Sequence, residues 1–209
     1  MRRAALLTFA AVVLAAFALI WGAESLYPKT DASAVVLVAV TGVGLWIARP
    51  GWHLRPARFS AYWLVPIGLL LASAAGAGWF LMSFEVPLPY GLSTRNLWAA
   101  MPAILLITGI EELLFRQVMY RWLEQRGFSG RSPAIATALA FSWAHLGPVF
   151  LGSAIGATFY LLQSAYMAWI GILLGEIRRR TESWAMAWLG HFCYNLTVLY
   201  VLHAASPGR

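Results

Sequence analysis

Residues 97–120 read LWAAMPAILLITGIEELLFRQVMY, and this stretch decides the fold class of the chain. It is longer than the about 20 apolar residues that a helix needs to cross the roughly 30 Å hydrocarbon core of a bilayer. Its charged residues are Glu111, Glu112 and Arg116, which stand close together inside the apolar run. The stretch therefore predicts a membrane-spanning helix that carries three charges within the bilayer.

The composition of the whole chain agrees with a membrane protein. Of its 209 residues, 61% are hydrophobic and 11% are charged, whereas soluble domains average about 45–50% apolar and about 25% charged residues. A soluble globule or a disordered chain does not fit these values. The formal net charge is +7, but the basic residues stand between long apolar runs, as they do where they set membrane topology. We therefore expect the lipid bilayer, and no nucleic acid, as a partner.

Six further apolar runs accompany the first stretch. Together they make about seven spans, at residues 4–22, 34–48, 61–82, 97–120, 133–146, 154–175 and 184–202. The first run resembles a signal peptide, but the bulky Trp21 makes a poor cleavage site, so we predict an uncleaved helix. Residues 147–159 are rich in small side chains, and an additional short or re-entrant segment stays open there. The sequence predicts an all-α fold, a polytopic transmembrane bundle of about seven to eight helices.

The basic residues predict how the bundle is oriented. With a cytoplasmic N-terminus, eleven of the 15 Lys and Arg residues fall on inner segments and three on outer segments, which is the positive-inside pattern. We interpret Arg178-Arg179-Arg180 as part of this topology signal. The chain is thus expected to be a multi-pass protein of the plasma or inner membrane, with its C-terminus outside. We expect one membrane-embedded domain over 1–209, with N-terminal helices without a motif over 1–94 and a catalytic core over 95–203.

The three charges inside the span need a physical reason. Each charge near the middle of a membrane costs at least about 2.5–3.5 kcal/mol on insertion scales. Glu112 and Arg116 are four residues apart and share a helix face, so they fit either a structural ion pair or a pair that supports a site. Glu111 is rotated by about 100° from Glu112 and has no such partner, so a structural role explains it poorly.

Two later spans carry polar residues at a similar depth. His145 ends the run Phe141-Ser-Trp-Ala-His145, and the seventh span contains His191-Phe-Cys-Tyr-Asn195. Counted from the arginine-rich ends, Glu111 lies about 15 Å deep and His145 about 20 Å deep. His191 and Asn195 lie about 15–20 Å deep on the same scale. Each of these features alone is typical of helix packing, but their common depth predicts one shared polar site.

These residue types can hydrolyse an amide. Hydrolysis needs an activated water, a proton donor for the leaving amine and hydrogen-bond donors for the oxyanion. A buried Glu suits a general base, a His beside it can share the water, and an Asn with a second His can donate to the oxyanion. Glu and His are also zinc ligands, although the spacing of a zincin motif is missing.

The three runs together resemble a known family. Glu111-Glu112-Leu-Leu-Phe-Arg116, Phe141-Ser-Trp-Ala-His145 and His191-Phe-Cys-Tyr-Asn195 are similar to the motifs EExxxR, FxxxH and HxxxN. These occur in this order in the CAAX-protease and bacteriocin-processing family of intramembrane endopeptidases, which includes the Ras-converting-enzyme type. The resemblance covers roughly residues 95–200 and implies a glutamic-type protease in a helical bundle.

The resemblance also implies roles for the residues. Glu111 and His145 would act on the water, His191 and Asn195 would form the oxyanion hole, and Glu112 and Arg116 would support the site. No cofactor is expected, with zinc as the alternative because the family has also been described as metal-dependent. One departure is Gln117, where family members often carry Gly.

Two other function classes stay open. The polar cluster could pack a non-catalytic membrane scaffold or immunity factor, or it could relay protons in a proton-coupled transporter. The enzyme hypothesis predicts a membrane protein or lipidated peptide as substrate, and no residue chooses between them. The oligomeric state and the role of residues 1–90 stay open as well.

Overall fold

The computed structural model describes residues 2–26, 32–48, 64–82, 97–146 and 157–205. The helices are α1 (Arg2–Leu26), α2 (Ala32–Ala48), α3 (Leu64–Met82), α4 (Leu97–Glu112), the π-helix η3 (Leu113–Met119), α5 (Tyr120–Gln125), α6 (Ser132–Ala144), α8 (Ala157–Thr181) and α9 (Trp184–Ala205). Helices α4, η3 and α5 follow one another without a break, so we count them as one helical rod. On this count, the described residues form seven helical rods and no strand. The predicted all-α fold is confirmed, and each predicted apolar run forms a helix.

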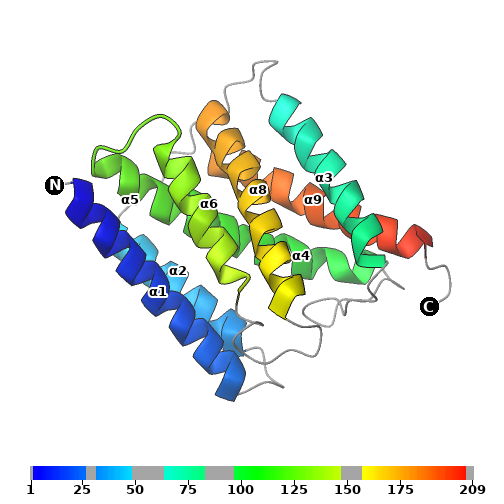
Figure 1. Ribbon diagram of the computed structural model, residues 1–209, viewed down its shortest axis with the longest axis horizontal. Helices are drawn as coiled ribbons and strands as arrows, with labels where there is room; N and C mark the ends of the chain where they lie inside the picture. Colours follow the sequence, from blue (N-terminus) through cyan, green and yellow to red (C-terminus); the bar gives the residue numbers. More distant parts are fainter. Residues whose placement is uncertain (1, 27–31, 49–63, 83–96, 147–156, 206–209) are drawn as a thin grey trace.

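Figure 1 shows how the rods are arranged. Helices α1 and α2 lie together at one side of the bundle, α3 and the C-terminal end of α9 lie at the other, and α6 and α8 lie between them. The rod made of α4, η3 and α5 crosses the bundle from one side to the other. Most of the predicted segment at 147–159 falls outside the described residues, and its last three residues belong to α8.

Three helices have the length and apolarity of a full membrane span within the described part of the chain. They are Leu64–Leu81 in α3, Thr158–Thr181 in α8 and Trp184–Ala204 in α9. Helices α1 and α2 carry shorter apolar stretches, Leu7–Ala16 and Val35–Trp46. Large apolar side chains also point outward from the bundle, which suits contact with lipid rather than water.

The buried apolar side chains form two clusters. One joins α3, α8 and α9, and its members are Leu70, Ala74, Ile170, Leu173, Leu174, Ile177, Ala187, Tyr194, Val198 and Leu202. The other joins α1, η3 and α6, and its members are Val13, Leu114, Phe115, Met119, Ala140 and Phe141. His191 of α9 lies between the two clusters, because its ring is beside Phe141 of the second cluster and Tyr194 of the first.

Small residues let α6 and α8 approach closely. A Cβ atom built on Gly171 would lie 2.9 Å from Ala138 Cα, and one built on Gly175 would lie 2.8 Å from Ala134 Cβ. Such contacts are shorter than real Cβ atoms make, so a larger residue at either position of α8 would force the two helices to shift. Close backbone approach through small residues is a common way to pack helices in membranes.

A pair of serines joins the same two helices. Ser142 Oγ donates to the carbonyl oxygen of Ser164 at 2.7 Å, and Ser164 Oγ donates to that of Ser142 at 2.9 Å. Both side chains are buried. Helix α6 is thereby held against α8 near its C-terminal end, where His145 follows.

Candidate active site

The two glutamates of the first motif end α4, directly before a π-helix. In a π-helix the backbone bonds run from residue i to i+5, which widens the turn and is often found at functional sites. The π-helix η3 covers Leu113–Met119 and so contains Arg116. The sequence predicted an ordinary α-helix here, because no Gly or Pro marks the change.

Glu112 is buried between two partners. Its Oε1 accepts a hydrogen bond from Nδ1 of His191 at 2.9 Å, and its Oε2 lies 3.2 Å from Nε of Arg116. The side chains of Glu112 and Arg116 are both 0% exposed. The ion pair that their spacing predicted is confirmed, and it is linked to the histidine of α9.

Glu111 lies on the other side of the same imidazole. Its Oε2 is 3.8 Å from Nε2 of His191, which is an ion-pair distance but too long for a hydrogen bond. Its side chain keeps 16% of its surface exposed, whereas that of His191 keeps 5%. His191 therefore stands between two carboxylates, of which Glu111 is the more accessible.

His145 lies at the C-terminal cap of α6 and is oriented by its own helix. Its Nδ1 is 2.8 Å from the carbonyl oxygen of Phe141, and a carbonyl can only accept. Nδ1 is therefore the protonated nitrogen, and in the neutral ring Nε2 keeps its lone pair. An imidazole in this tautomer can take a proton from a water molecule.

Phe141 is the common neighbour of the charged and imidazole groups. Its ring centre is 4.7 Å from that of His145 and 5.6 Å from that of His191, both with edge-to-face geometry. The Arg116 guanidinium carbon lies 5.1 Å from the same ring centre, a cation–π contact. In the sequence, Phe141 stands out only as a motif residue, and its position four residues before His145 is the signal for a shared helix face.

Two arginines bind backbone carbonyls across the contact between η3 and α8. Arg116 Nη2 donates to the carbonyl oxygen of Gly171 at 2.9 Å. In return, Arg178 Nε donates to the carbonyl oxygen of Arg116 at 3.2 Å. Arg178 is only 3% exposed, so it makes a buried contact that the prediction of a topology signal for the three arginines did not include. Each of the two helices thus contributes one buried arginine to the backbone of the other.

The structure joins five of the six predicted residues in one set of contacts. Phe141 contacts His145, His191 and Arg116, and His191 in turn lies beside Glu112 and Glu111. Asn195 lies one turn beyond His191 on α9 and is half-buried. Its amide makes no hydrogen bond to any described residue, so its predicted role in the oxyanion hole stays a prediction. In the part of the chain that is described, no three His, Cys, Asp or Glu side chains are grouped to hold a metal ion.

Comparison with known proteins finds a family model that matches this chain. The family model described as type II CAAX prenyl endopeptidase Rce1-like matches residues 92–197, just over half of the chain. The matched region contains all three motifs and every residue of the cluster. No curated protein and no solved structure matches the chain.

Proposed function

The chain belongs to the Rce1-like family of type II CAAX prenyl endopeptidases, and from this premise we propose that it hydrolyses peptide bonds with the Glu/His cluster described above. Family and apolar helices together make it an integral membrane protein and a CAAX-type protease. The mechanism rests on the position of His191, whose side chain is buried between two carboxylates. Its Nδ1 lies 2.9 Å from Glu112 Oε1, and its Nε2 lies 3.8 Å from Glu111 Oε2. Two carboxylates and an imidazole from different helices meet here inside an apolar bundle.

In this mechanism, Glu111 and His145 activate the attacking water. Glu111 is the more exposed carboxylate, and Nε2 of His145 has a lone pair, so either group can accept the proton as the water oxygen bonds to the carbonyl carbon. The protonated group then gives the proton to the leaving amine when the C–N bond breaks. Glu112 is already paired with Arg116, which supports a positioning role for it.

His191 and Asn195 are proposed to stabilise the oxyanion. A protonated His191 donates from both ring nitrogens, from Nδ1 to Glu112 and from Nε2 toward the substrate oxygen. The Asn195 amide, which lacks a hydrogen bond to the described residues, can supply a second donor from the next turn of α9. Fixed donors of this kind are typically worth about 10²–10³ in rate.

The donor set fits a zinc ion poorly. A catalytic zinc takes three protein ligands and keeps an open position. Here Glu112 is committed to Arg116, whose positive charge lies 3.2 Å from the carboxylate and would repel a cation. We therefore propose the glutamic-type mechanism rather than the metalloprotease.

The substrate is proposed to be a membrane protein or a lipidated peptide whose scissile bond reaches the cytoplasmic half of the bilayer. The positive-inside count supports a cytoplasmic N-terminus and an external C-terminus. Reporter fusions at residues 1 and 209 test this orientation, and reporters that are active on the same side of the membrane would contradict it.

The proposed function is tested by removing the base. Glu111→Gln and His145→Ala are compared with Glu124→Gln, which changes a carboxylate of a surface pair with Arg121 instead. In cells, proteomics compares the three variants and identifies any precursor protein that stays uncut with Glu111→Gln and His145→Ala but is cut with Glu124→Gln. In vitro, the purified chains are given a prenylated Cys-a-a-X peptide, the substrate type that the family name suggests.

We expect about 10²–10⁴-fold slower cleavage for Glu111→Gln, because general-base catalysis contributes that much. Full activity in both variants would overturn the assignment. A chelator should leave activity intact; loss that added zinc restores would favour the metalloprotease instead.

A further inference from the structure

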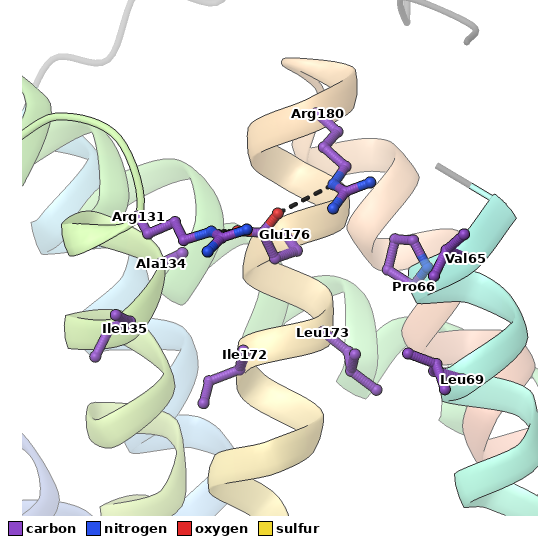
Figure 2. Close-up of a pocket in the computed structure, with 10 residues that line it drawn as sticks. All are labelled: Val65, Pro66, Leu69, Arg131, Ala134, Ile135, Ile172, Leu173, Glu176 and Arg180. Carbon is purple, nitrogen blue, oxygen red and sulfur yellow. Dashed lines mark hydrogen bonds and ion pairs between the residues drawn. The ribbon is translucent and has the colours of Figure 1, made fainter. Parts of the chain in front are cut away.

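A groove lies on the outer face of the bundle, away from the candidate active site. It runs between α3 on one side and α6 with α8 on the other and has a cavity volume of about 310 Å³. Its lining includes the apolar side chains of Leu69, Ile135 and Ile172 and the charged side chains of Arg131, Glu176 and Arg180 (Figure 2). The groove therefore combines an apolar wall with a charged rim.

The charged and apolar parts lie at different depths. Arg180 is the last residue but one of α8, and Arg131 directly precedes α6. Ile172 lies eight residues before Arg180 on α8, about 12 Å further inward at 1.5 Å per residue. Figure 2 shows the same order, with the two arginines and Glu176 grouped at one end of the groove. In a membrane this places the rim toward the interface and the apolar wall among the acyl chains.

The rim carries a net positive charge. Glu176 lies 3.2 Å from Arg131, 2.8 Å from Arg179 and 3.0 Å from Arg180. Three guanidinium groups thus share one carboxylate. The lining residues Arg131, Glu176 and Arg180 carry a net charge of +1, and Arg179 beside the groove adds one more. The side chain of Arg131 is 71% exposed, so its guanidinium is open to a further anion.

We propose that this groove binds an anionic phospholipid of the surrounding bilayer. Its phosphate contacts Arg131 and Arg180, and one acyl chain lies along Leu69, Ile135 and Ile172. Both the net charge and the depth order of the groove match such a lipid, which joins an anionic head to an apolar chain. A soluble anion matches only the rim, and a zwitterionic lipid lacks the net charge. The proposal does not depend on the peptidase mechanism.

Lipid retention by the purified full chain tests the proposal. Mixed micelles supply phosphatidylglycerol or phosphatidylcholine, and native mass spectrometry measures how much of each lipid stays bound. We expect phosphatidylglycerol to bind more tightly, and Arg131→Gln with Arg180→Gln to weaken it by about tenfold, because each arginine near the headgroups contributes to lipid attraction. Arg121→Gln with Arg126→Gln removes the same charge outside the groove and should leave retention unchanged.

Two further variants keep the test decisive if the double variant folds poorly. Ile172→Trp fills the apolar wall without a change in charge and should reduce retention. Glu176→Gln removes the carboxylate that competes with the phosphate and should increase it, a gain that misfolding cannot produce. The proposal would be overturned if both double arginine variants lost the same amount of bound lipid, or if the chain showed no preference for phosphatidylglycerol over phosphatidylcholine. It would also be overturned if inorganic phosphate competed for the groove as well as the lipid does.

Discussion

Two of the polar contacts between helices in this bundle differ in how completely their hydrogen-bonding groups are satisfied. Between α6 and α8, the hydroxyls of Ser142 and Ser164 each donate to the carbonyl of the other residue. Where the end of α4 and the start of η3 meet α9, Glu112 contacts Arg116 and His191. Three buried atoms there make no hydrogen bond to any described residue: Glu112 Oε2, Arg116 Nε and Arg116 Nη1. The 3.2 Å pair of Nε and Oε2 is an ion pair without hydrogen-bond alignment.

The difference indicates which contact is structural. Buried polar groups are normally satisfied, so a buried group that is not needs an explanation. The serine contact is closed and has no capacity left for a ligand. The charged cluster instead leaves buried atoms of Glu112 and Arg116 unsatisfied, which favours the proposed positioning role over a purely structural one.

Removing one partner of the Glu112–Arg116 pair should reduce stability more than the other changes considered. Arg116→Met leaves Glu112 buried without its cation and Gly171 without its donor, so we expect a loss of about 3–5 kcal/mol in the free energy of unfolding. Thermal unfolding in detergent measures it. The double variant Arg116→Met/Glu112→Gln should recover part of the stability while peptidase activity stays absent. Wild-type stability in the single variant would show that the pair is not a charged one.

The close packing beside the contact should come next. Gly171→Ala forces a Cβ to 2.9 Å from Ala138 Cα and pushes away the carbonyl that Arg116 binds. We expect a cost of about 1–3 kcal/mol, as for other overpacked sites. Gly76→Ala in α3 is the matched control, because a Cβ there meets nothing within 4 Å. Similar unfolding midpoints for the two variants would contradict the close approach.

A smaller effect is expected from the arginine that binds the π-helix. Arg178→Gln should lower kcat by about tenfold and leave KM near the wild-type value, because a hydrogen bond from a charged group is lost while the binding surface stays intact. Arg178→Lys should restore part of the rate. Arg179→Gln is the control, since Arg179 pairs with Glu176 at the surface. A rate that is equally low with Lys and with Gln would argue against positioning through this bond.

Removing a serine hydroxyl from the contact between α6 and α8 should reduce stability the least. Ser142→Ala and Ser164→Ala should each cost about 0.6 kcal/mol, the average for side-chain hydrogen bonds between membrane helices. The double variant should cost no more than about twice this, and its peptidase activity should equal that of the wild type. Loss of activity without loss of stability would move this serine pair into the functional site.

The length of the apolar runs predicted the helices well because a membrane demands long apolar segments. The run predicted at 184–202 corresponds to α9 at Trp184–Ala205, and the run at 61–82 corresponds to α3 at Leu64–Met82. The pair of Glu112 and Arg116 was predictable because both lie on one helix at a fixed spacing.

The contacts between helices could not be predicted from the sequence. Spacing along α4 could not tell which carboxylate would bond to His191, and it is Glu112 that does so at 2.9 Å. The carbonyl of Gly171 has no side-chain signal at all, and Arg178 looked like its two neighbours in the run of arginines. The roles of the site residues in catalysis stay predictions until the variants are measured.

The crossed bonds of Arg116 and Arg178 have a mechanical consequence. Each arginine grips the main chain of the opposite helix, at Gly171 and at Arg116. Sliding one helix along the other would strain both bonds at once, and rotating either helix would strain at least one. The two bonds therefore tie η3 to α8 at two neighbouring points, and we expect them to resist a shift of either helix along the other.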